Sequence, residues 1–164
     1  MSDRYEVPVL EVAGLSLSYG DENGHARVVH DVSFSVAPGE VVALVGESGS
    51  GKTSTAQAVI GLLADNGRRD KGSIRLNGTE ISTWSQKRLD AIRGAVVSLI
   101  PQDPSSSLNP VLTIGAQVRE ILEVHGRARG READRMVVDL LGHVGLSDPE
   151  LRARQYPHEL SGGM

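Results

Sequence analysis

The strongest constraint on the fold is a glycine-rich loop that lies between an apolar run and an amphipathic pattern. Residues 41–45 read Val-Val-Ala-Leu-Val, a short continuous apolar run that favours a strand buried on both faces of a parallel sheet. Residues 46–53 read Gly-Glu-Ser-Gly-Ser-Gly-Lys-Thr, and from Lys52 to Leu63 apolar side chains recur at helical spacing. The order strand, loop, helix predicts an α/β protein.

The loop predicts a binding site for the phosphates of a nucleotide. Its glycines let the chain curl and remove Cβ atoms, so that backbone N–H groups can approach an anion. Lys52 supplies a positive charge for the β- and γ-phosphates, and the Thr53 hydroxyl can ligate magnesium. A Gly/Ser loop that matches by chance is disfavoured by the strand before it and the helix after it. We therefore assign the nucleotide contacts to Gly46, Glu47, Ser48, Gly49, Ser50, Gly51, Lys52, Thr53 and Ser54.

The rest of the sequence predicts two parts that meet near residue 100. The second part, residues 101–164, is expected to be helical, because apolar stripes follow residues 114–122 and 133–144 on either side of a solvated connector at 126–130. The first part, residues 1–100, is expected to form the ATP-binding core. Its further elements are strands at 10–18, 28–36 and 95–100, a hairpin at 73–81 turning at Asn77-Gly78, and a short polar helix at 85–93.

Charge and composition exclude several classes of function. The net charge of −4 argues against nucleic acid as a partner, and the arginines at 127, 129, 131 and 135 have no interleaved aromatic residues that would support base stacking. No cysteine is present, which excludes disulfides and thiol catalysis. The five histidines are scattered, so we do not expect them to bind a metal. No apolar run approaches the roughly 20 residues of a spanning helix, and no signal peptide is expected.

Three further motifs extend a resemblance to one family over nearly the whole chain. Gln102-Asp103-Pro104 follows the apolar strand expected at 95–100, Leu160-Ser161-Gly162-Gly163 stands near the end, and Tyr19 ends the first strand. Together with the loop at 46–53, these motifs resemble those of the ATP-binding subunits of ABC transporters. In that family the loop at 46–53 would be Walker A, Gln102 would lie in the Q-loop, and residues 160–163 would be the signature. Residues 102–115 and 156–164 resemble the peptide, oligopeptide and nickel importer branch of that family.

The resemblance implies a role for each motif. Tyr19 would stack on adenine. Gln102 would contact magnesium, as Thr53 does, and the attacking water. Ser161, Gly162 and Gly163 would donate hydrogen bonds to the γ-phosphate of ATP held by a second ATP-binding subunit. The candidate catalytic residues are Lys52, Gln102 and Ser161. The cofactors are ATP and magnesium, and the further partners are the transporter's membrane subunits, which would place the chain at the cytoplasmic face of the membrane.

The sequence departs from the family pattern at its end. The Walker B aspartate, the catalytic glutamate and the switch histidine of the family follow the signature, whereas this sequence ends at Met164. Residues 136–139, Met-Val-Val-Asp, mimic a Walker B run, but they share a helical stripe and precede the signature. Pro101 stands where the family usually has an aromatic residue. We therefore expect an incomplete ABC ATPase domain: a P-loop NTPase core, an N-terminal antiparallel β part and a helical subdomain.

Two other functions fit the same motifs. One is an ABC ATPase without a transport role, such as a chromosome-maintenance or ribosome-associated type. The interval between Gln102 and Ser161 leaves no room for the long coiled coil of a chromosome-maintenance protein, and the importer-like stretches favour transport. The other is a fragment that binds nucleotide without turning it over, since the water-orienting residues are missing from this sequence. The transported solute and the choice between a homodimer and a heterodimer stay open.

Overall fold

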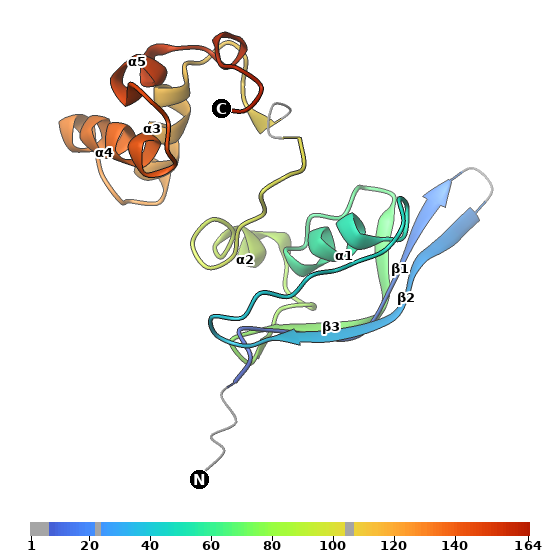
Figure 1. Ribbon diagram of the computed structural model, residues 1–164. Coiled ribbons are helices and arrows are strands. Elements are labelled where there is room, and N and C mark those ends of the chain that lie inside the picture. Colours follow the sequence, from blue (N-terminus) through green and yellow to red (C-terminus); the bar gives the residue numbers. More distant parts are fainter. Residues whose placement is uncertain (1–6, 22–23, 104–106) are drawn as a thin grey trace. The chain divides into compact units, whose positions relative to one another are not determined.

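The computed structural model describes residues 7–21, 24–103 and 107–164 (Figure 1). The chain divides into two compact units, Met1–Leu99 and Ile100–Met164. Each unit has its own hydrophobic core. No helix among the described residues is long and apolar enough to cross a membrane.

The first unit is built on an antiparallel sheet of four strands in the order β2-β1-β3-β4. The expected strands at 10–18 and 28–36 are confirmed, and both are longer than predicted. The hairpin at 73–81 is also confirmed, and its turn residues Asn77 and Gly78 both have positive φ (48° and 76°), as a tight type I′ turn requires. The strands are β1 (Leu10–Asp21), β2 (Gly24–Val36), β3 (Gly67–Leu76) and β4 (Thr79–Glu80).

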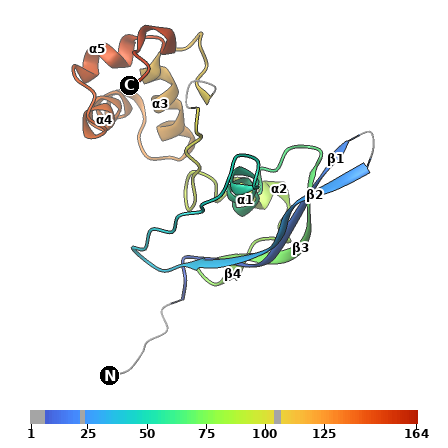
Figure 2. The same cartoon turned by 45° about the vertical axis from the view of Figure 1, so that its right-hand side comes forward.

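Helix α1 (Lys52–Val59) covers one face of this sheet (Figure 2). Its buried residues Ala58 and Val59 join a core that includes Leu15 and Leu17 of β1. The helix is four residues shorter than predicted, because Gly61 turns the chain with a φ of +67°. The carbonyls at its end are satisfied by Arg93, which donates to the oxygens of Ile60 and Gly61. The short helix expected at 85–93 is α2 (Gln86–Asp90).

The strand predicted for a parallel sheet at residues 41–45 and the apolar strand predicted at residues 95–100 are both absent from the structure. Residues 41–45 have no regular secondary structure, and Val41 and Val45 are 94% and 92% exposed. Residues 95–100 contain only one isolated bridge, between Arg93 and Val97, and Ile100 is 89% exposed. The predictions of a buried strand at 41–45 and of a strand at 95–100 are therefore wrong for this structure. A strand in a parallel sheet needs neighbours that complete its hydrogen bonds, and no described strand pairs with either segment.

The second unit consists of α3 (Ile114–Val124), α4 (Gly130–His143), α5 (Pro149–Arg154) and a 3-10 helix, Pro157–Glu159. The predicted helices are confirmed, and α3 is capped by Thr113, whose side chain accepts a hydrogen bond from the Ala116 N–H. The apolar stripes are only partly buried, since Ile121 is 61% and Val144 74% exposed. The expected solvated connector is wrong at one position, because Ala128 is buried in the core of this unit. Helix α5, with Pro149 at its start, was not predicted.

Candidate nucleotide-binding site

The glycine-rich loop leads directly into the N-terminus of α1. Gly49 and Gly51 have positive φ angles of 82° and 88°, which other residues adopt only with strain. Gly51 also lies against β2, since an added Cβ would be 2.7 Å from Cγ2 of Val29 and 3.0 Å from the Val28 carbonyl oxygen. The first turn of the helix is fixed by Thr55, whose N–H and hydroxyl both donate to the Gly51 carbonyl at 2.8 Å. This geometry explains the need for glycine at 49 and 51.

Lys52 folds back across the loop that precedes it. Its ammonium donates to the carbonyl oxygens of Gly46 (2.8 Å) and Glu47 (2.6 Å) and to the hydroxyl of Ser50 (3.3 Å). The loop also has a hydrogen bond from the Ser50 N–H to the Glu47 carbonyl, at 3.2 Å. Together these bonds close the loop into a ring that holds one positive charge beside the amino end of a helix. A positive charge beside the amino end of a helix is chemically suited to an anion.

The rest of the loop is open to solvent. Residues 46–50 and Thr53 are exposed, whereas Ser54 is half-buried. A hollow of about 370 Å³ adjoins the loop and is lined by residues of β2, by Leu44 and Val45, and by Ser50, Gly51, Lys52 and Thr55. The exposed Thr53 hydroxyl leaves an oxygen ligand available to a magnesium ion. The residues of the loop therefore fit a magnesium-bound triphosphate.

Tyr19 lies near the end of β1, opposite Ala26 of β2 and Gly67 of β3. Its ring lies over Gly67, because an added Cβ at that glycine would be 2.7 Å from Cε1 of the tyrosine. The residue is half-buried. It shares the first unit with the loop, and its contact with adenine stays a prediction.

The remaining predicted site residues belong to the second unit. Gln102 lies in an exposed bend, and Ser161, Gly162 and Gly163 are exposed in a turn closed by the Met164 N–H donating to the Ser161 carbonyl at 2.9 Å. The loop at 46–53 lies in the first unit. That Gln102 and the residues of 161–163 act on nucleotide therefore also stays a prediction. The rejected Walker B mimic at 136–139 lies within helix α4.

A polar network beside Tyr19 was missed by the sequence analysis. Asp70 accepts hydrogen bonds from the Ser18 hydroxyl and from Nε of Arg68, both at 2.9 Å, and Nε of Arg27 lies 3.7 Å from its other oxygen. The hydrogen bond from Ser18, followed by the hydrogen bond and charge of Arg68, lowers the pKa of the Asp70 carboxyl below its ordinary value. No sequence signal could have found this network, because strand register alone brings together residues about fifty positions apart.

The phosphate loop, the helix that follows it and the sheet define a P-loop nucleotide-binding protein. The chain belongs to the ABC transporter family, whose sequence profile matches residues 29–164. An oligopeptide transport ATP-binding protein of Mycobacterium tuberculosis is 45% identical over 157 residues, which are 95% of this chain and 26% of that protein. A putative peptide import ATP-binding protein of Brucella melitensis is 43% identical, over 95% of this chain and 47% of its own length.

A dipeptide transport ATP-binding protein of Escherichia coli is 42% identical, again over 95% of this chain and 48% of the relative. The chain thus spans from about a quarter to about half the length of these relatives. Among solved structures, a dimeric ATP-binding cassette bound to ADP and phosphate matches with a TM-score of 0.76 and 21% identity, over 94% of this chain and 64% of that one. The predicted ABC ATPase fold class is confirmed.

Proposed function

We propose that this chain is the nucleotide-binding part of an ABC importer, and that the whole protein couples ATP hydrolysis to the uptake of peptides. The observation that carries the proposal is the closed loop of residues 46–51, with the Lys52 ammonium held across it by three hydrogen bonds. The names of the relatives support the choice of peptides, because all three describe ATP-binding proteins of oligopeptide, peptide or dipeptide transport.

Each part of the loop has a separate task in this proposal. The backbone N–H groups of Gly49 to Thr53 face the β- and γ-phosphates, with the helix dipole of α1 behind them. The Lys52 ammonium moves from the loop carbonyls to the phosphate oxygens, which are stronger acceptors because they are charged. Magnesium, when bound, neutralises charge on the phosphates, and Thr53 and Gln102 would hold it.

The base and the second nucleotide involve residues outside the loop. Tyr19 stacks on adenine, for which an aromatic face is worth about 1–3 kcal/mol. Ser161, Gly162 and Gly163 donate to the γ-phosphate of ATP bound to a second ATP-binding subunit. The chain then pairs with a second ATP-binding subunit, identical or not, and binds the transporter's membrane subunits on the cytoplasmic side of the membrane.

The transport role is tested with the whole natural protein and its cognate membrane subunits. After reconstitution in vesicles with the matching binding protein, ATP hydrolysis is expected to increase on addition of short peptides, and peptide uptake should follow ATP consumption. A Lys52→Ala protein is the control and should show neither response. Hydrolysis that is unaffected by every peptide and by the membrane subunits would favour an ABC ATPase without a transport role.

A further inference from the structure

The end of strand β1 is held by the segment Asn66–Asp70, which contains the start of β3. Asn66 holds both backbone groups of Gly20: the Gly20 N–H donates to the Asn66 carbonyl, and the Asn66 side-chain amide donates to the Gly20 carbonyl, each at 2.8 Å. On the other side of Tyr19, the Ser18 hydroxyl donates to Asp70 and accepts from Nε of Arg68 at 3.1 Å. Both chain neighbours of Tyr19 are therefore fixed by the same short segment.

The ring of Tyr19 depends on this segment as well. Gly67 pairs with Tyr19 across the β1–β3 ladder, and the ring occupies the space that a side chain at Gly67 would fill. An added Cβ would lie 2.7 Å from Cε1 and 3.2 Å from Cδ1 of the ring, and 3.1 Å from the Ala64 carbonyl oxygen. The added Cβ would be too close to the ring and would also crowd a backbone carbonyl, so the side chain of Tyr19 would have to move.

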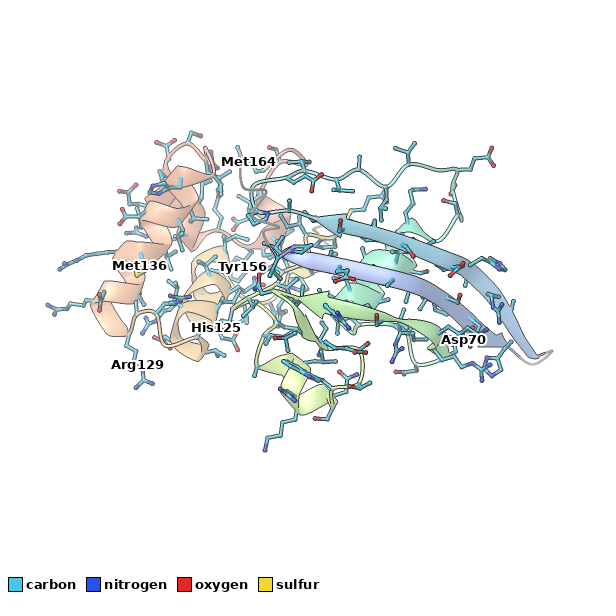
Figure 3. All side chains as sticks on the ribbon, turned by 90° about the horizontal axis from the view of Figure 1, so that it is seen from below. Asp70, His125, Arg129, Met136, Tyr156 and Met164 are labelled. Carbon is cyan, nitrogen blue, oxygen red and sulfur yellow. The ribbon has the colours of Figure 1, made fainter. Side chains whose placement is uncertain are left out.

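The segment Asn66–Asp70 is itself held in place by polar groups. Asp70 is only 11% exposed, and it is shared by Ser18, Arg68 and Arg27, which come from three different strands. Figure 3 shows Asp70 at the end of the sheet where β1 ends and β2 begins. The network thus links β1, β2 and β3 next to Tyr19 and reduces the conformational freedom of the backbone there.

We propose that Asn66, Gly67 and Asp70 are positioning residues that hold the Tyr19 ring ready for the base of the nucleotide. This inference rests on the proposed stacking role of Tyr19. A ring that is already fixed loses less conformational entropy when the base stacks on it, and this lowers the cost of binding. The segment acts on the base and not on the phosphates, so its effect should vanish for a ligand without a base.

The test compares Mg-ATP with magnesium tripolyphosphate, which carries the phosphates alone. In the 164-residue chain, Gly67→Ala is expected to weaken ATP binding at least about fivefold, as Tyr19→Ala does, because both remove stacking worth about 1–3 kcal/mol. Binding of tripolyphosphate should be unchanged in both variants. The matched control is Gly142→Ala in α4, where the added Cβ would make only an ordinary contact of 3.6 Å with Pro149; it should bind both ligands normally.

Two further variants make the outcome decisive. In a Tyr19→Ala background, Gly67→Ala should cost no additional ATP affinity, since the group that it displaces is already gone. Asn66→Ala, at an exposed position, removes one hydrogen bond without overpacking and should weaken ATP binding about two- to fivefold, again with no change for tripolyphosphate. If Tyr19→Ala weakens ATP binding and neither Gly67→Ala nor Asn66→Ala does, the positioning role is wrong and the stacking role stands. If Tyr19→Ala itself binds ATP normally, the stacking role fails too.

Discussion

Replacing Lys52 by alanine removes the side-chain cation that the structure places over the phosphate loop. In the chain without nucleotide its ammonium contacts two carbonyls and a hydroxyl, and all three belong to exposed residues. Water can replace these contacts, so we expect the folded state to lose less than about 1 kcal/mol in Lys52→Ala. The loss should instead appear in binding, where a hydrogen bond to a charged group contributes about 1.5–3 kcal/mol. That range corresponds to roughly 10- to 150-fold weaker binding of ATP.

Isothermal titration of Mg-ATP into both proteins measures this ratio, and urea unfolding measures the change in stability. Lys87→Ala is the matched control, because Lys87 is an exposed lysine of α2 with no role in the loop; its affinity should equal that of the parent chain. Equal affinities of Lys52→Ala and the parent would refute the assignment of the phosphate site. A large loss of stability in Lys52→Ala would show instead that the ammonium supports the loop fold itself.

Tyr19, Asp70 and the exposed run at residues 41–45 can each be tested by substitution. Tyr19→Phe should bind ATP nearly as well as the parent, whereas Tyr19→Ala should lose about 1–3 kcal/mol; equal behaviour in titration calorimetry would exclude stacking. The lowered pKa of the Asp70 carboxyl stabilises the folded chain above the ordinary pKa of 3.8, and this contribution is lost as the pH falls below that value. Urea unfolding between about pH 2 and 6 should therefore show a flatter acid side in Asp70→Asn, and an unchanged profile would argue against the network. Val41→Asp combined with Val45→Asp should change the free energy of unfolding by less than about 1 kcal/mol and reduce binding of the dye ANS, whereas a loss of several kcal/mol would mean that the run is buried.

Local patterns predicted most of the elements because their causes lie within a few residues. Asn77-Gly78 specifies its own turn, since both residues tolerate positive φ. The alternating residues of β1 pack Leu15 and Leu17 into the core, and the stripe of α4 buries Ala133, Val137 and Leu141. The phosphate loop could also be predicted, since its glycines and its lysine act on their own backbone.

Features that depend on distant segments were not predictable. The run at 41–45 has the composition of a buried strand. Burial also requires a neighbouring strand to pair with, however, and the five residues of the run do not show whether one is present. The same reasoning applies to residues 95–100. The contacts around Tyr19 follow from the register of β1 with β3, with irregularities between Ala13 and Leu17 that no local pattern shows. The family resemblance supplied roles for Gln102 and Ser161, which belong to a different unit from the loop.

Binding of nucleotides that differ only in their phosphates tests the central claim most directly. If the loop of residues 46–53 holds the β- and γ-phosphates, the 164-residue chain should bind Mg-ATP at least about tenfold more tightly than AMP, and Lys52→Ala should remove most of that difference. Equal affinities for ATP and AMP, or a preference for ATP that survives in Lys52→Ala, would contradict the account.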